Sequence, residues 1–187
     1  MPHTLRLTAV LLGIGAFGAA TAAPETQSTV TQPAVWQLHH AQFDYFGITS
    51  RYTCDGLEVK VRQILEYLGA RRGVSVTATG CPRGPESLSR DAWVRVDFST
   101  LVAAPDASTP ADAVAATWVP LNLVAQRPFF MGDGDCELID HMRKLLTDNF
   151  SWRGKLAYRT DCPIETTEFH DYQIQGELLK PSDQRAH

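Results

Sequence analysis

Residues 54–81 read CDGLEVKVRQILEYLGARRGVSVTATGC, and this stretch decides the fold class. Apolar side chains recur at the spacing of one face of an α-helix, at Leu57, Val61, Ile64, Leu65 and Leu68. Residues 74–79 (VSVTAT) are rich in β-branched side chains and predict a strand. Cys54 and Cys81 therefore stand at the two ends of one helix and one strand.

A second stretch, residues 136–162, has the same order and reads CELIDHMRKLLTDNFSWRGKLAYRTDC. A shift of 81 positions carries four of the five apolar helix positions onto apolar residues, Leu138, Met142, Leu145 and Leu146. The same shift carries Cys81 and Pro82 onto Cys162 and Pro163. This self-similarity predicts that the chain contains one structural unit twice.

Each unit is predicted to hold a strand, a helix and two more strands. The predicted strands cover 42–53, 74–79 and 91–100 in the first unit, and 117–125, 155–160 and 172–178 in the second. The predicted helices begin near Asp55 and Cys136 and end near Gly69 and Asp148. Strands with helices on one face predict an α+β fold. We expect a two-layer sandwich of sheet and helices, built from two tandem β-α-β-β pseudo-repeats and ferredoxin-like in style.

The beginning of the chain has the composition of a secretory signal peptide. Arg6 precedes a short apolar run, and small residues follow up to a cleavage site near Ala22. The predicted organisation is a signal peptide (1–22), a flexible polar tether (23–34), a first α+β repeat (35–102), an Ala/Pro-rich linker (103–116), a second α+β repeat (117–180) and a polar tail (181–187). We therefore expect a protein of the periplasm, or a secreted one.

Charge and hydropathy narrow the classes of partner. The formal net charge is −4 and no run of basic residues occurs, so nucleic acid is not an expected partner. No apolar run outside the signal peptide is long enough to span a membrane. The partners that remain are a small molecule, a glycan or an envelope protein.

An even number of cysteines in an exported chain predicts disulfide bonds. A strand that follows a helix runs back beside it, so its end lies near the helix start. This geometry favours the pairs Cys54–Cys81 and Cys136–Cys162 over the other two pairings. A thiol redox protein is the alternative, although no C-x-x-C motif is present.

The chain has none of the common short motifs of catalysis, cofactor binding or metal binding. G-x-S-x-G, the P-loop, G-x-G-x-x-G and H-E-x-x-H do not occur, and no catalytic residue, cofactor or metal ligand is predicted. GDGDCEL places Asp133, Asp135 and Glu137 at alternate positions, but Leu138 stands where a calcium loop requires glycine. We expect Asp133 or Asp135 to cap the following helix instead, with Glu137 favoured by the helix dipole. A weak, irregular cation site is the alternative.

Trp93 is the candidate for a contact surface. In DAWVRVDFST the side chains of Val94, Val96 and Phe98 alternate with those of Trp93 and Arg95, which places the last two on the solvent face. We expect this face to meet a partner or a carbohydrate. The sequence thus favours a non-catalytic binding or envelope-accessory module. A hydrolase or metal-assisted enzyme with a site dispersed over the sheet is the alternative.

Overall fold

A computed structural model describes residues 30–82, 87–104, 110–162 and 171–183. The predicted signal peptide and its cleavage point near Ala22 lie outside these residues. The described elements are β1 (Gln32–Phe46), α1 (Cys54–Tyr67), β2 (Ser75–Thr79), β3 (Asp91–Ala103), β4 (Val114–Val124), the 3₁₀ turn η1 (Asp133–Asp135), α2 (Cys136–His141), α3 (Arg143–Asn149), β5 (Trp152–Asp161) and β6 (Asp171–Pro181).

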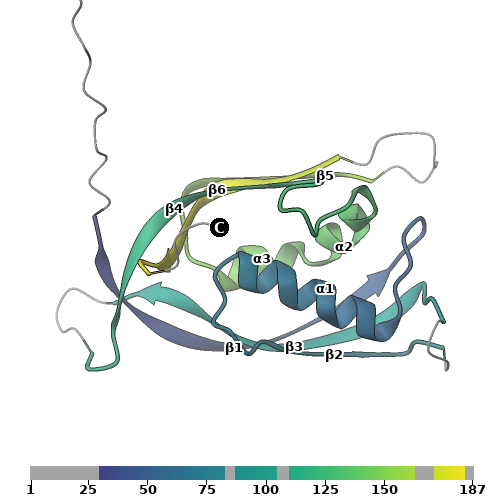
Figure 1. Cartoon of the computed structure of the whole chain (residues 1–187), viewed down its shortest axis with the longest axis horizontal. Helices are drawn as coiled ribbons and strands as arrows, with labels where there is room; N and C mark the ends of the chain where they lie inside the picture. Colours follow the sequence, from purple (N-terminus) through teal and green to yellow (C-terminus); the bar gives the residue numbers. More distant parts are fainter. Residues whose placement is uncertain (1–29, 83–86, 105–109, 163–170, 184–187) are drawn as a thin grey trace, which may run out of the picture.

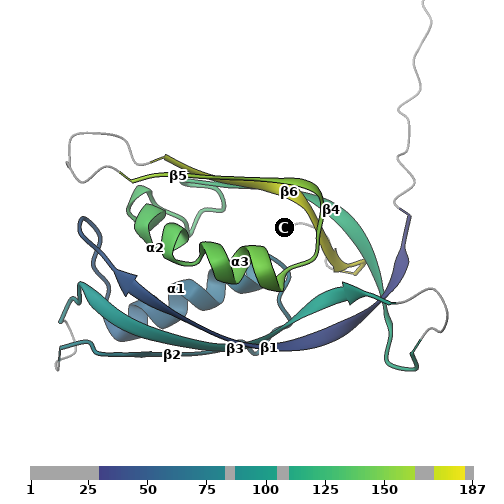
Figure 2. The same ribbon diagram turned by 180° about the vertical axis from the view of Figure 1, so that it is seen from behind.

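All six strands belong to one antiparallel sheet with the order β2-β3-β1-β4-β6-β5. Among the described residues, the two halves of this sheet are joined only where residues Gln32–Ala34 of β1 pair with Val114–Ala116 of β4. The sheet folds over at this junction, so that β1, β3 and β2 form one layer and β4, β6 and β5 form the opposite layer (Figure 1). The helices lie between the layers, as the view from behind also shows (Figure 2). The fold is α+β as predicted, but the helices are covered on both sides instead of on one.

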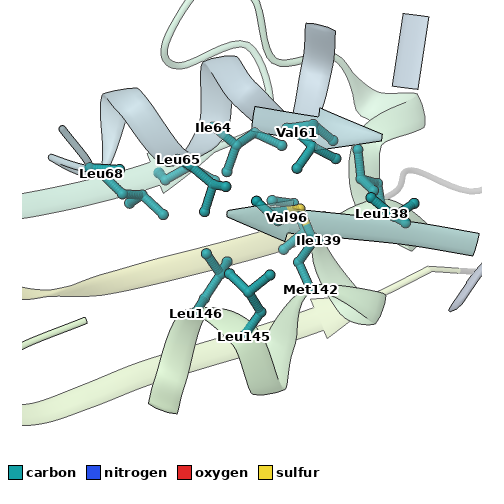
Figure 3. Close-up of a cluster of buried hydrophobic side chains, with 14 of the residues drawn as sticks. Val61, Ile64, Leu65, Leu68, Val96, Leu138, Ile139, Met142, Leu145 and Leu146 are labelled. Atoms are coloured by element: carbon teal, nitrogen blue, oxygen red, sulfur yellow. The ribbon is translucent and has the colours of Figure 1, made fainter. Parts of the chain in front are cut away.

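Helix α1 forms where the sequence predicts it. The Thr53 side chain caps the helix by accepting a hydrogen bond from the backbone N–H of Gly56. The five predicted apolar positions, Leu57, Val61, Ile64, Leu65 and Leu68, are each no more than 1% exposed. They face the buried side chains of the second half across the centre of the molecule (Figure 3).

The second predicted helix is divided at Met142 into α2 and α3. Met142 donates its backbone N–H to Leu138 O and accepts from Leu146 N, so helical hydrogen bonds continue on both sides of the division. The predicted apolar face, which also includes Leu145, is buried as expected. One amphipathic stripe therefore spans two short helices.

A side chain from each half also binds the C-terminal end of the helix that belongs to the other half. Lys180 on β6 donates its ammonium to Tyr67 O, the last residue of α1, at 2.6 Å. Thr100 on β3 donates its hydroxyl to Asn149 O, the last residue of α3, at 2.7 Å. Both contacts satisfy carbonyl groups that a helix end leaves without an intrahelical partner. The two layers are thereby connected through the core as well as through the sheet junction.

Several predicted boundaries differ from the structure. Gln32–Ala34, expected to end the flexible tether, are the first residues of β1, and Ala34 is fully buried at the junction. Strand β3 extends to Ala103 and β4 begins at Val114, so the linker is shorter at both ends than predicted. These residues become ordered because they pair with strands that are distant in sequence, which local composition does not reveal.

His39 gives the fold a dependence on pH. Its side chain lies between the sheet and α3, where Nε2 is 2.8 Å from the hydroxyl of Thr100. Burial lowers the pKa of His39, a hydrogen bond from the ring to the Asn149 side chain opposes this change, and the adjacent His40 lowers the pKa further.

Because the folded state prefers neutral His39, its contribution to stability is fully present above the unfolded pKa of about 6.5. The contribution is lost as the pH falls from there towards the lowered pKa of the folded state. We expect His39→Gln to reduce the loss of unfolding free energy between neutral and mildly acidic pH, measured by urea denaturation. His40→Gln, at an exposed position of the same strand, should have a smaller effect, because His40 makes only the smallest contribution to the lowered pKa of His39. An equal effect of both variants would contradict this assignment.

Candidate functional site

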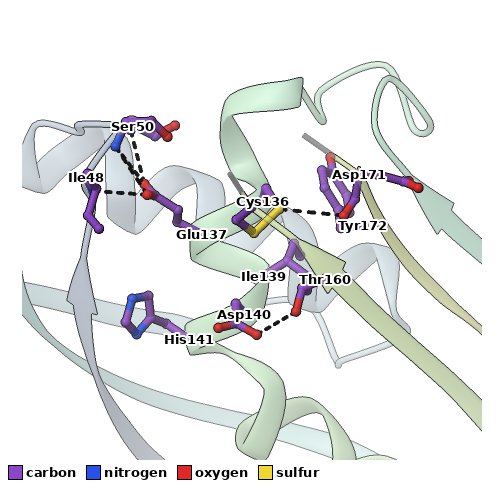
Figure 4. Close-up of a disulfide and its surroundings, with 12 residues drawn as sticks. Ile48, Ser50, Cys136, Glu137, Ile139, Asp140, His141, Thr160, Asp171 and Tyr172 are labelled. Atoms are coloured by element: carbon purple, nitrogen blue, oxygen red, sulfur yellow. Dashed lines mark hydrogen bonds between the residues drawn. A yellow bond between two sulfur atoms is a disulfide. The ribbon is translucent and has the colours of Figure 1, made fainter. Parts of the chain in front are cut away.

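Both cysteine pairs that the sequence predicts are joined in the structure. The Cα atoms are 5.9 Å apart in Cys54–Cys81 and 5.6 Å apart in Cys136–Cys162, and no cysteine is free. Each bond links the start of a helix to the end of the strand that follows it (Figure 4 shows the second). Cys136 is fully buried, whereas Cys54 and Cys81 are half-buried. The bonds hold together the end of the molecule at which both helices begin.

Glu137 uses its carboxylate to fix the connection between β1 and α1. Its two oxygens accept four hydrogen bonds of 3.1–3.2 Å from the backbone N–H groups of Ile48, Thr49 and Ser50 (Figure 4). The side chain is 8% exposed. A buried carboxylate with this many donors is held in place and stabilises the loop that it binds. Glu137 therefore has a structural role that its position in the first helical turn did not reveal.

The prediction that Asp133 or Asp135 caps the following helix is wrong, since no side-chain hydrogen bond caps α2. Asp135 has long-range partners instead. Its Oδ2 atom accepts from Lys60 Nζ at 3.0 Å and from Gly132 N at 2.6 Å, and its Oδ1 atom accepts from the Tyr52 hydroxyl. Burial and the neighbouring Asp135 carboxylate raise the pKa of Tyr52. Long-range partners outcompete the local cap because they include a cation that is itself largely buried.

These residues line a cleft of about 390 Å³ between α1 and the segment that precedes η1. Phe129 at its rim is 95% exposed. The cleft brings together an ammonium, a carboxylate and a phenol, which are groups that enzymes use. However, both oxygens of Asp135 already accept protein donors, and Lys60 also donates to Phe130 O. The arrangement ties the segment 130–135 to α1.

Trp93 and Arg95 lie on the outer face of the β2-β3-β1 layer, away from the helices, as the alternation predicts. Trp93 is 65% exposed, whereas Val94, Val96 and Phe98 are buried against the helices. The strand register places Asp44 of β1 and Thr79 of β2 directly opposite Trp93, one on each side. The indole is thus surrounded by polar side chains from both neighbouring strands.

The outer face is hollowed on both sides of Trp93. On one side a hollow of about 450 Å³ lies among Trp93, Phe46, Asp44, Asp91 and Thr79. On the other side a hollow of about 80 Å³ is lined by Trp93, Arg95, Gln42, Thr77 and Thr79. Phe46 is 48% exposed, so a second aromatic side chain is available beside the larger hollow.

Sequence reasoning identified Trp93 and Arg95 but missed Asp44, Phe46 and Asp91. The sequence does indicate that Asp44 and Phe46 share a face, because QFDYF alternates as a strand does. Which strand faced which could not be read from this alternation. Asp44 is opposite Trp93, and Phe46 is opposite Asp91, only because β1 and β3 pair in one particular register.

No group of three or more histidine, cysteine, aspartate or glutamate side chains in the described ranges is placed to hold a metal ion. Nor does the part of the chain that the structure describes contain a helix of the length and apolar character needed to cross a membrane. The surface around Trp93 remains the best-defined candidate for contact with a ligand.

Comparison with known proteins supplied no relative: no family model, curated protein or solved structure matches the chain.

Proposed function

We propose that the protein is an exported, disulfide-linked, non-catalytic binding or envelope-accessory module, and that it contacts its partner through the outer face around Trp93. The observation that carries this proposal is the 65% exposure of Trp93 between two hollows. Exposed tryptophan is costly to hydrate and is enriched at the centres of binding surfaces. No described segment of the chain covers it.

Export is part of this proposal. The signal-peptide composition of residues 1–22 supports it, and so do the two disulfide bonds, which form and persist in oxidising compartments. A bacterial periplasm is our preferred location, because nothing in the sequence indicates transport beyond it.

We also propose that the two halves arose by duplication of a β-α-β-β unit. Within the sheet, β3 lies between β1 and β2, and β6 lies between β4 and β5, which is a split β-α-β arrangement in each half. Trp36 and Trp118 occupy corresponding places beside the junction. Arg71 lies 5.9 Å from the ring centroid of Trp36, and Arg153 lies 5.4 Å from that of Trp118. A shift of 82 positions, one more than the shift that aligns the helices, relates Trp36 to Trp118 and Arg71 to Arg153.

The buried carboxylates and the cysteines do not favour a catalytic function. An enzyme needs acids or bases with room for a substrate proton, and the two buried carboxylates, Asp135 and Glu137, are occupied by protein donors. A thiol redox role is not favoured either, because the sequence has no C-x-x-C motif and the Cys136 sulfur is fully buried. The geometry therefore favours a binding surface over a reaction centre.

Photo-crosslinking tests the contact surface. A photo-crosslinking amino acid in place of Thr77, which lines the smaller hollow, is expected to give a defined adduct in cells that produce the protein naturally. Trp93→Ala should reduce the adduct by at least about tenfold, because tryptophan at an interface centre often contributes that much affinity. Adduct identity and yield are measured by mass spectrometry.

The matched control carries the same crosslinker in place of Ala157, an exposed residue of β5 in the other layer. Thermal unfolding of Trp93→Ala should be close to that of the wild type, since the side chain is mostly exposed. Equal adducts at both positions, or an adduct at Thr77 that is unchanged by Trp93→Ala, would contradict the proposed surface.

A further inference from the structure

The larger hollow beside Trp93 is lined by both aromatic and acidic side chains. Trp93 of β3 and Phe46 of β1 lie on one diagonal of the strand pair, and Asp44 of β1 and Asp91 of β3 lie on the other. Diagonal neighbours on one face of an antiparallel pair are about 7–8 Å apart. Two exposed aromatic side chains and two exposed carboxylates therefore surround a single space.

The charge in this space is not balanced by the described residues. Neither Asp44 nor Asp91 forms a side-chain hydrogen bond or ion pair with any of them. By contrast, Asp97, two positions beyond Arg95 on the same face, is bound by His40 at 2.6 Å. The Arg95 side chain lines the opposite side of Trp93, in the smaller hollow. The larger hollow thus presents two carboxylates and no cation of its own.

An organic cation matches these walls. Aromatic faces attract ammonium and guanidinium groups through the negative potential over the ring, and a carboxylate adds a charge-assisted hydrogen bond. A planar guanidinium can stack on an aromatic ring while its edge donates hydrogen bonds to carboxylates. A neutral sugar would also stack on Trp93, and its hydroxyl groups can donate hydrogen bonds to the carboxylates, but it would leave the two negative charges without a counter-charge.

We propose that the hollow formed by Trp93, Phe46, Asp44 and Asp91 binds the guanidinium group of an arginine side chain on a protein partner. This inference rests on the proposed binding function and names the chemistry that the surface recognises. The hollow is open to solvent along the sheet face, so a side chain that projects from another protein can enter without passing a rim. Arg95, on the far side of Trp93, disfavours a second cation there and orients the partner.

A pair of peptides tests the assignment. Acetyl-Gly-Arg-Gly-amide and its citrulline analogue have nearly the same shape, but only the first carries a positive charge. We expect the arginine peptide to shift the amide NMR signals of β1 and β3 around Asp44 and Trp93, and to bind on the order of tenfold more tightly than the citrulline peptide. Trp93→Ala should weaken its binding by about two- to fivefold, the range of a cation–π contact at an exposed site.

Asp44→Asn and Asp91→Asn should each weaken binding of the arginine peptide by a few-fold, on the order expected for an exposed ion pair. Asp97→Asn, on the same face of the same strand as Trp93, removes the same charge outside the hollow and should leave the affinity nearly unchanged. Equal binding of the two peptides, or equal effects of Asp44→Asn and Asp97→Asn, would overturn the cation assignment.

These outcomes separate the inference from the function on which it rests. Suppose that the arginine peptide fails to bind, while the crosslinker at Thr77 still captures a partner in a manner that depends on Trp93. In that case the contact surface stands and the guanidinium assignment is wrong. Loss of both results would overturn the two proposals together.

Discussion

Replacing Cys136 and Cys162 with alanine is expected to lower the free energy of unfolding by about 3–4 kcal/mol. The bond closes a loop with a sequence separation of 26 residues, and its removal lets the unfolded chain regain the corresponding conformational freedom. Cys136 is also fully buried, so the missing sulfur atom leaves a small cavity beside the core. Urea denaturation without reductant measures the change.

The other disulfide bond is a matched control. Cys54–Cys81 has a sequence separation of 27, so loop closure contributes nearly the same amount in both cases. Its cysteines are only half-buried, and alanine substitution there should cost slightly less because little packing is lost. A pair of alanine variants that both retain wild-type stability would contradict the role of these bonds. A much larger loss at Cys54 and Cys81 would contradict the contribution from burial.

The cysteine spacing predicted both disulfide bonds, because each bond joins a helix to the strand that follows it in the sequence. Helix α1 was equally accessible, since its five apolar positions lie within twelve consecutive residues, from Leu57 to Leu68. Its cap was not predicted, because the predicted helix begins at Asp55 whereas Thr53 is the observed N-cap. An apolar pattern with the period of a helix predicts the observed element well when the helix buries a single face.

What the sequence could not predict depends on contacts between distant residues. Nothing near Gln32 indicates that β1 starts there, because its first residues pair with β4 about eighty positions away. The crossed contacts of Lys180 with Tyr67 and of Thr100 with Asn149 likewise need the folded-over sheet. The hollow beside Trp93 has the same origin, since the pairing register of β1 with β3 decides which side chains meet. The alternation in β3 predicted that Trp93 is exposed, but its neighbours Asp44 and Phe46 follow only from the tertiary structure.

Asp135→Ala is the substitution for which we expect the second of the two largest effects, a loss of about 3–5 kcal/mol in the free energy of unfolding. The Asp135 side chain is 5% exposed and that of its partner Lys60 is 19% exposed. Alanine would leave the Lys60 ammonium without its counter-ion and the Tyr52 hydroxyl and Gly132 N–H without an acceptor. Unsatisfied buried donors and an unpaired buried charge are among the costliest consequences of a single substitution.

Asp133→Ala is the control for this experiment, because Asp133 is the same residue type two positions earlier and is exposed. Its effect should stay within about 0.5 kcal/mol, as for most surface substitutions. The double variant Lys60→Met with Asp135→Ala should recover part of the loss, since it removes the unpaired cation together with its partner. Urea denaturation gives all three values. If Asp135→Ala and Asp133→Ala had similar effects, the ion pair would not hold the segment 130–135 against α1. The two halves would then be held together at this end by other contacts, among them the hydrogen bonds of Glu137 with Ile48 and Ser50.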